Sequence, residues 1–270
     1  MTVDPDRVAR IIGEIADAIV APRFGRLEDH EVRSKSGPDD LVTEVDEAAE
    51  RALERALRDI YPAAQFIGEE TVAREPARAD ALKGDGAFWV VDPLDGTRNF
   101  VRGVAEFGSI VALVEGGETR MGFIHATPER KTAVAVKGDG ATWAGAPLLP
   151  QRETHAPPRG LRSISWLPEA ERRRVQAGLA QFQSRTGHCS AYSYLLLARG
   201  EIDFKISSRI HPWDHLAGAL ILDELGGRTS FLETGAPLGS QPPLDRALLA
   251  VAPGRDWDRF ATVLRGEAQG

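Results

Sequence analysis

A single cysteine, Cys189, stands in this chain of 270 residues. One thiol excludes an internal disulfide framework and a zinc site built from paired thiolates. Because chains without disulfides are typical of reducing compartments, we expect a cytoplasmic protein. No nearby motif supplies Cys189 with a base, so the residue is expected to be a small buried side chain and not a nucleophile.

Other motifs are missing as well. The six histidines are scattered, with only His211 and His215 at helical spacing, and the absence of an HExxH pattern disfavours zinc. No EF-hand pattern points to calcium. No GxGxxG follows an expected strand, which excludes a dinucleotide-binding oxidoreductase. There is no internal repeat and no low-complexity tract.

Long apolar runs and long basic runs are also absent. Without the former, no membrane-spanning segment is expected, and the acidic residues near the N-terminus are unlike a signal peptide. The net charge of −7 argues against nucleic acid and anionic membranes as partners. The composition therefore predicts a soluble protein with a small partner.

Hydrophobic residues make up 42% of the chain, enough for a substantial core. Asp4 with Pro5 starts one amphipathic helix, and Thr43 with Asp46 starts a second, which ends near Pro62. Short apolar runs such as FWVV, GSIVALV and TAVAV then predict strands. A proline-rich stretch at 148–160 precedes alternating strands and helices. We expect an α/β fold with two halves, residues 1–150 and 151–270.

Carboxylates gather at the ends of apolar runs. Glu69 and Glu70 are expected to end one strand, in FIGEE. Asp92 is expected to end another, after FWVV, with Asp95 three residues later, and Asp214 lies at a helix start. Neighbouring carboxylates repel one another, so grouping them destabilises a fold unless a cation neutralises them. Magnesium suits such a site because it takes oxygen ligands and leaves room for phosphate oxygens.

The loop after Asp92 adds features that suit an anion. Gly96 permits close backbone approach, and a helix that begins at Thr97 would present free N–H groups to a phosphate. Pro93 restricts the backbone, so the Leu94 carbonyl and the flanking carboxylates can converge on ions.

Each of these residues also has an ordinary structural interpretation. Asp46 is the capping-box partner of Thr43, Asp214 can complement a helix dipole, and Asp95 can belong to a simple turn. The carboxylates could also form a solvated rim, but the apolar segments around them disfavour that interpretation.

Together these segments resemble the inositol monophosphatase family, whose members also dephosphorylate fructose bisphosphate, histidinol phosphate and phosphoadenosine nucleotides. VDPLDGTRNF resembles its first signature, HPWDHLAGALILDELGG its second, and DLVTEVD and FIGEE its upstream acidic motifs, in order, over residues 35–227. The resemblance implies a layered αβαβα sandwich, a homodimer and inhibition by lithium. It also implies hydrolysis of a phosphomonoester by water that two or three magnesium ions activate.

The resemblance further assigns roles to residues. Asp92 would bridge two ions, and a third, weaker ion would lie at Glu69. Asp46, Glu69 and Thr97 would be catalytic, with Asp46 and Thr97 orienting the attacking water. Asp95, Gly96 and Thr97 would be substrate contacts, with backbone N–H groups around Gly96 and Thr97 receiving the phosphate and Lys35 near the mouth of the site. The implied metal ligands are Glu69, Glu70, Asp92, the Leu94 carbonyl, Asp95 and Asp214.

The substrate side departs from the family pattern. A segment that is often Gly-Ser-Ala-Ala in the family is His188-Cys189-Ser190-Ala191 here, and Ser207 replaces an acidic residue that contacts inositol. Lys205 and Arg209 flank Ser207, which suits a second anionic group. Ser190, Ala191, Ser207 and Arg209 are therefore candidate substrate contacts, whereas His188 and Tyr192 either line the pocket or pack in the core.

We accordingly expect a small sugar, polyol or nucleotide phosphate as substrate, with inositol phosphate as one candidate. The alternative is a catalytically weak protein that binds a phosphorylated metabolite or regulates a partner on the same fold. Every metal-side position of the family pattern is filled in this chain, which favours the enzyme.

Overall fold

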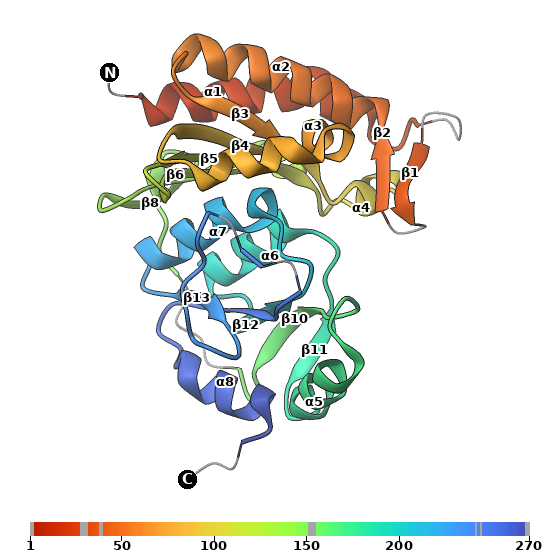
Figure 1. The fold of residues 1–270 in the computed structure, drawn as a ribbon, viewed down its shortest axis with the longest axis vertical. Helices are drawn as coiled ribbons and strands as arrows, with labels where there is room; N and C mark the ends of the chain where they lie inside the picture. Colours follow the sequence, from red (N-terminus) through yellow and green to blue (C-terminus); the bar gives the residue numbers. More distant parts are fainter. Residues whose placement is uncertain are drawn as a thin grey trace.

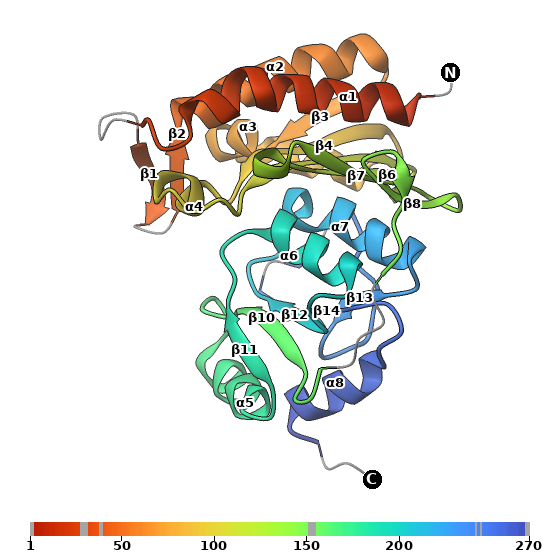
Figure 2. The ribbon, with the colours of Figure 1, turned by 180° about the vertical axis from the view of Figure 1, so that it is seen from behind.

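The computed structural model describes residues 3–27, 32–37, 40–150, 155–240, 242–243 and 245–267, without the side chains of 34–37 and 40. Within these residues, helices and sheets alternate in layers (Figures 1 and 2). Helices α1 (Pro5–Ile15) and α2 (Glu44–Ile60) cover the outer face of a seven-stranded sheet, and α6 (Ser190–Arg199) and α7 (Pro212–Glu224) lie between it and a five-stranded sheet. Helices α5 (Glu169–Leu179) and α8 (Trp257–Arg265) complete the outer layer. The predicted αβαβα sandwich is confirmed.

Local sequence signals set the starts of the first two helices. The carboxylate of Asp4 accepts hydrogen bonds from the N–H groups of Asp6 and Arg7, and Pro5 occupies the first helical position. Helix α1 continues into a π-helical turn at Ala16–Val20 and a 3-10 turn at Ala21–Arg23. The capping box predicted at Thr43 and Asp46 is present at the start of α2.

The larger sheet has the order β3-β4-β5-β6-β7-β8-β9. β3 and β4 are parallel and all later neighbours are antiparallel. Its central strands are nearly uniformly apolar because helices cover both faces. The strands are β3 (Gln65–Gly68), β4 (Ala87–Asp95), β5 (Gly108–Glu115), β6 (Glu118–Ala126), β7 (Lys131–Val136), β8 (Gly140–Trp143) and β9 (Ala146–Pro147).

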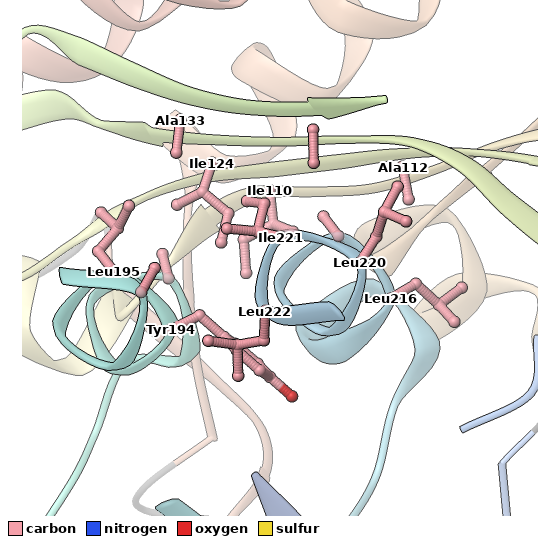
Figure 3. Packing of buried hydrophobic residues seen from close by; sticks show 14 of the residues in the cluster. Ile110, Ala112, Ile124, Ala133, Tyr194, Leu195, Leu216, Leu220, Ile221 and Leu222 are labelled. Carbon is pink, nitrogen blue, oxygen red and sulfur yellow. The ribbon is translucent and has the colours of Figure 1, made fainter. Parts of the chain in front are cut away.

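Helix α7 packs directly on this sheet (Figure 3). Leu216, Leu220 and Ile221 are buried with Ile110 and Ile124 of the sheet in one apolar cluster. Each such side chain contributes roughly 1.5–3 kcal/mol on burial. The approach is close enough that a Cβ on Gly122 would lie 2.8 Å from the Ala217 carbonyl oxygen. This packing ties the second half of the chain to the first.

The smaller sheet has the order β11-β10-β12-β14-β13. β10 is parallel to both β11 and β12, whereas β14 is antiparallel to β12 and β13. The polar edge strand β11 carries no apolar run and was not among the predicted strands. The strands are β10 (Arg159–Ser163), β11 (Gln183–Thr186), β12 (Phe204–Ser207), β13 (Arg228–Phe231) and β14 (Leu248–Val251).

A short hairpin and two short helices adjoin helix α2 and the larger sheet in the sequence. A separate hairpin pairs β1 (Val32–Gly37) with β2 (Asp40–Thr43), α3 (Glu69–Arg74) follows β3, and α4 (Thr97–Val101) follows β4. The boundary expected after residue 150 adjoins residues 151–154, which lie outside the described part, so the division into two halves stays a prediction. No helix among the described residues is long and apolar enough to cross a membrane.

Candidate active site

A polar cavity of about 850 Å³ opens between the two sheets. One wall comes from the end of β4 and the start of α4, and the other from β10, β12 and the first turns of α6 and α7. Six of the residues proposed from sequence as metal ligands or as the catalytic threonine line this cavity: Glu69, Asp92, Leu94, Asp95, Thr97 and Asp214.

Three carboxylates meet in this cavity. Asp92, Asp95 and Asp214, called the acid triad below, each place one oxygen so that all three oxygens lie within 4.8 Å of one another. Asp92 and Asp95 are buried and Asp214 is half-buried. Strand β4 runs on to Asp95 and does not end at Asp92 as expected, because a register shift opposite β5 accommodates Pro93, which has no N–H to donate.

Hydrogen bonds fix the positions of two members of the acid triad, Asp92 and Asp95. The Leu94 N–H donates to Asp92 Oδ1 at 3.0 Å. At the start of α6, the Ala191 N–H donates to Asp95 Oδ2 at 2.6 Å, and the Cys189 thiol donates to the same oxygen at 2.8 Å. These contacts join β4 of the larger sheet to α6. Cys189 is buried. Its burial, and to a lesser extent the nearby charge of Asp95, raise the pKa of the thiol well above the ordinary value, so the thiol keeps its proton and donates the hydrogen bond.

Burial also governs the charges of the acid triad. Desolvation raises the pKa of Asp95, and it raises the pKa of Asp214 well above the ordinary value, with the charges of Asp95 and Glu69 adding to the second effect. The three carboxyl groups cannot easily all be ionised at once unless a divalent cation neutralises their charge. The donor set therefore fits magnesium.

Asp46 and Thr97 are joined across the site. The Thr97 hydroxyl lies 2.9 Å from Asp46 Oδ1 and 2.9 Å from the Leu94 carbonyl oxygen. Asp46 Oδ2 accepts hydrogen bonds from the N–H (2.8 Å) and hydroxyl (2.5 Å) of Thr43. Burial raises the pKa of Asp46 to about 6, against the lowering effect of these hydrogen bonds. The cap of α2 and the predicted water-orienting carboxylate are thus one group.

The two adjacent glutamates have different surroundings. Glu69 and Glu70 begin helix α3 and do not end strand β3 as expected, since Gly68 is already the helix cap. Glu69 lines the cavity and interacts electrostatically with Asp46 and Asp214. Glu70 is buried and is not part of the cavity lining, so its role as a ligand stays a prediction without support from this geometry.

Glu50, which was not predicted as a site residue, holds the start of helix α3 in place. Its carboxylate accepts hydrogen bonds from the Glu70 N–H and the Thr71 hydroxyl, both at 2.7 Å. Glu50 is buried on the face of α2 that also carries Leu53 and Leu57. An acidic residue on an otherwise apolar helix face was the signal in the sequence that could have identified it.

Gly96 occupies the turn between β4 and α4. Its φ of +86° lies in the left-handed region, and a Cβ there would lie 2.9 Å from the Glu106 carbonyl oxygen. The helix predicted to begin at Thr97 is present, though it has only five residues. Phosphate binding by the N–H groups of Gly96 and Thr97 stays a prediction.

The opposite wall holds the predicted substrate contacts. Ser190, Ser207 and Arg209 line the cavity, whereas Ala191 is buried behind it and contacts Asp95 through its N–H. Lys35 belongs to β1, but its side chain lies outside the described part of the chain. His188 lines the cavity, and Tyr192 packs partly buried against the core.

Two further residues on this wall were not selected from sequence. Trp166 is 58% exposed at the cavity, and the Arg209 guanidinium lies 4.7 Å from the centre of its ring. Arg209 has a φ of +60°, which is unusual for a residue with a side chain. Arg162 also lines the cavity and donates to the Ser184 carbonyl and hydroxyl oxygens. A single exposed tryptophan belongs to no recognisable sequence motif, so its position at the cavity could not be predicted from the sequence.

Comparison with known proteins adds independent information. The inositol monophosphatase family profile matches residues 6–263. The chain is 30% identical over 232 residues to the inositol-1-monophosphatase of Bacillus subtilis, covering 80% of this chain and 85% of that protein. It is also 30% identical over 260 residues to the histidinol-phosphatase of Mycobacterium tuberculosis, covering 92% and 96%.

Comparison of the fold agrees with the comparison of sequences. The solved structure of the Thermotoga maritima IMPase superposes with a TM-score of 0.76 at 25% sequence identity, covering 96% of this chain and 94% of that one.

Proposed function

Because the chain belongs to the inositol monophosphatase family and its relatives are phosphatases, we propose that it is a magnesium-dependent phosphomonoesterase. The observation that carries the proposal is the convergence of Asp92, Asp95 and Asp214 in a cavity that opens between the sheets. With Glu69 and the Leu94 carbonyl, these residues would hold two or three magnesium ions. Bound there, the ions would lower the pKa of water and neutralise charge on the phosphoryl group.

The chain's own groups would orient the nucleophile. When the Thr97 hydroxyl donates to Asp46, its lone pairs remain free to accept a hydrogen bond from a water molecule at the cavity. Asp46, with a pKa of about 6, is largely ionised at neutral pH and can hold that arrangement. Phosphoryl transfer depends mainly on positioning and charge neutralisation, so no covalent intermediate on the protein is needed.

The substrate wall favours a leaving group that carries negative charge. Ser207, which stands where family members place an acidic residue, brings no charge, while Arg162 and Arg209 bring positive charge to the cavity. We therefore propose a small sugar, polyol or nucleotide phosphate with a second anionic group, and the Trp166 face adds a surface on which a ring can stack.

Kinship supports further proposals. From membership of the family we propose a homodimer and inhibition by lithium. We also propose two halves: residues 1–150, which supply most acidic groups, and residues 151–270, which supply Asp214 and the substrate wall. The single cysteine supports a cytoplasmic location. Neither nucleic acid nor a membrane is proposed as a partner, because the net charge is −7.

The test is phosphate release across a panel of phosphorylated metabolites, with and without magnesium. We expect magnesium-dependent turnover that falls by about 100-fold or more in Asp95→Asn, because the substitution removes a carboxylate that would hold a magnesium ion beside the phosphoryl group. Asp80→Asn is the matched control, since Asp80 is exposed and pairs only with Lys83 among the described contacts.

Two outcomes would count against the proposal. A wild-type protein that binds phosphorylated metabolites without releasing phosphate would favour the alternative, a weakly catalytic binding or regulatory protein. If inositol monophosphate exceeded every sugar phosphate, bisphosphate and nucleotide in kcat/KM, the interpretation of Ser207 would be wrong.

A further inference from the structure

Trp166 is the only exposed member of the five tryptophans, all of which lie in the described part of the chain. Three of the others, Trp89, Trp213 and Trp257, are at most 6% exposed, whereas 58% of Trp166 is exposed. A single exposed apolar side chain needs no explanation by itself. What indicates a role is the position of Trp166 in the lining of the cavity, together with the contacts that hold it there.

The turn that carries Trp166 is firmly anchored. It connects β10 to α5, and the residues Ile164 and Leu167 on either side of the indole are buried in the apolar cluster of the smaller sheet. The Leu167 N–H donates to the Ile164 carbonyl at 3.3 Å, and the Trp166 N–H donates to the Ser208 hydroxyl at 3.2 Å. That hydroxyl donates in turn to the Ser163 carbonyl at 2.9 Å. Because the backbone is fixed before a ligand arrives, little conformational freedom is lost on binding.

Arg209 covers one face of the indole. Its guanidinium lies 4.7 Å from the centre of the Trp166 ring, and a φ of +60° holds its backbone in the left-handed region. A planar guanidinium stacks on an aromatic face and adds positive charge to it. Since 58% of Trp166 stays exposed with Arg209 over one face, the opposite face is open to a flat ligand. The Trp166–Arg209 pair is called the indole platform below.

The wall around the indole platform carries positive charge. Arg162 lines it with Arg209, and Lys205 lies buried in it with Nζ donating to the Ser190 hydroxyl at 3.0 Å. Among the described lining residues after position 150, Asp214 is the only carboxylate, and it belongs to the acid triad. A leaving group with an ammonium would therefore find no separate carboxylate to pair with on this wall, whereas a neutral aromatic ring needs none.

We propose that Trp166 determines the specificity of the site by stacking on the base of a nucleoside phosphate. The inference rests on the proposed function, and it narrows the sugar, polyol and nucleotide phosphates considered there to nucleotides. A flat base can cover the open face of the indole and displace water from both surfaces, and every base has such a face. A polyol has no flat face to offer, so it gains nothing comparable from the indole platform.

Substrate pairs that differ only in the base test this directly. Adenosine monophosphate, with the phosphate on each ribose hydroxyl in turn, and cytidine monophosphate are compared with ribose phosphate and glycerol phosphate in magnesium-dependent phosphate release. In the wild type we expect the best nucleotide to exceed the best substrate without a base in kcat/KM by about 10-fold or more. Trp166→Leu should remove about 10-fold of the nucleotide value, mainly by raising KM, and change the others by less than about two-fold.

Two further variants separate stacking from a general structural effect. Trp166→Phe keeps an aromatic face and should retain most of the preference for nucleotides. Trp143→Leu is the matched control, because the Arg199 guanidinium lies 4.2 Å from the centre of the Trp143 ring while Trp143 packs against the core and does not line the cavity. The ratio of nucleotide to ribose phosphate kcat/KM should stay at the wild-type value there, since both substrates report on the same folded molecules.

The outcomes separate the inference from the proposed function. If Trp166→Leu leaves that ratio unchanged, or lowers ribose phosphate as much as the nucleotides, the role of Trp166 in base recognition is refuted while the phosphatase stands. If histidinol phosphate, whose leaving group carries an ammonium, exceeds every nucleotide in kcat/KM, the inference is also refuted. If the wild type releases phosphate from none of these compounds, the proposed function and this inference both fail.

Discussion

His125 should make the protein unstable in mild acid. Its imidazole is 3% exposed on β6, with Nδ1 at 2.9 Å from the Thr132 hydroxyl and Nε2 without a partner among the described residues. A Cβ on Gly13 of α1 would lie 3.4 Å from the ring, so helix α1 packs close to the imidazole. Burial lowers the pKa of His125 to about 4, with Arg130 adding to the effect and Asp17 opposing it.

The sign and size follow from linkage. The folded pKa lies below the unfolded value of about 6.5, so the unfolded state takes up the proton first as the pH falls. Stability is fully present above pH 6.5 and is lost as the pH falls from about 6.5 toward about 4. At about 1.4 kcal/mol per pH unit, the loss over that interval is about 3 kcal/mol.

Urea unfolding of the wild type and His125→Asn between pH 4.5 and 7.5 measures this effect. Asparagine cannot be protonated in this range, and the space it leaves costs the same at every pH. The difference in unfolding free energy between the two proteins should therefore shift by roughly 2–3 kcal/mol across the range, in favour of the variant in acid. Acidic groups with raised pKa values, such as Asp46, are present in both proteins and cancel. Parallel pH curves would refute the reasoning.

Substitutions at two other positions, Thr97 and Glu50, probe the site and its support. Thr97→Val should lower kcat by about 100-fold in steady-state assays and change Tm by only a few degrees. Thr97→Ser should keep most of the activity, because only the hydroxyl facing Asp46 is needed. Equal losses of kcat in the two variants would contradict this role of the hydroxyl. Glu50→Ala should destabilise the fold by roughly 1–3 kcal/mol in urea unfolding, because the Glu70 N–H loses its buried acceptor, and an unchanged midpoint would remove Glu50 from this role.

The parts of the structure that depend on short-range signals could be predicted. The caps at Asp4 and Thr43 act within one helical turn, so their sequence patterns were sufficient. The gathering of acidic residues could also be predicted from local patterns, since Asp95 ends β4 and Glu69 directly follows β3, although the strand ends expected at Asp92 and Glu70 were wrong. Membership of a known family then supplied the layered arrangement, which no local pattern contains.

The remaining features depend on contacts between distant segments. Lys205 and Ser190 are fifteen positions apart, and nothing local to β12 predicts a buried ammonium. Trp166 meets Arg209 only because β10 and β12 are neighbours in the smaller sheet. The strand that continues past Asp92 depends on its partner β5, which tolerates the register shift. Sequence periodicity predicts single helices and strands, whereas these features depend on how two elements pack against each other.

The double use of Asp46 constrains how this protein can change. A carboxylate that only capped a helix could be exchanged for serine or asparagine in the course of evolution at small cost. Under the proposed function, a carboxylate that also bonds to Thr97 has no such freedom, and selection on turnover would restrict exchange at this helix start. Conversely, any variant that frays the first turn of α2 would disable the enzyme while most of the chain remained folded.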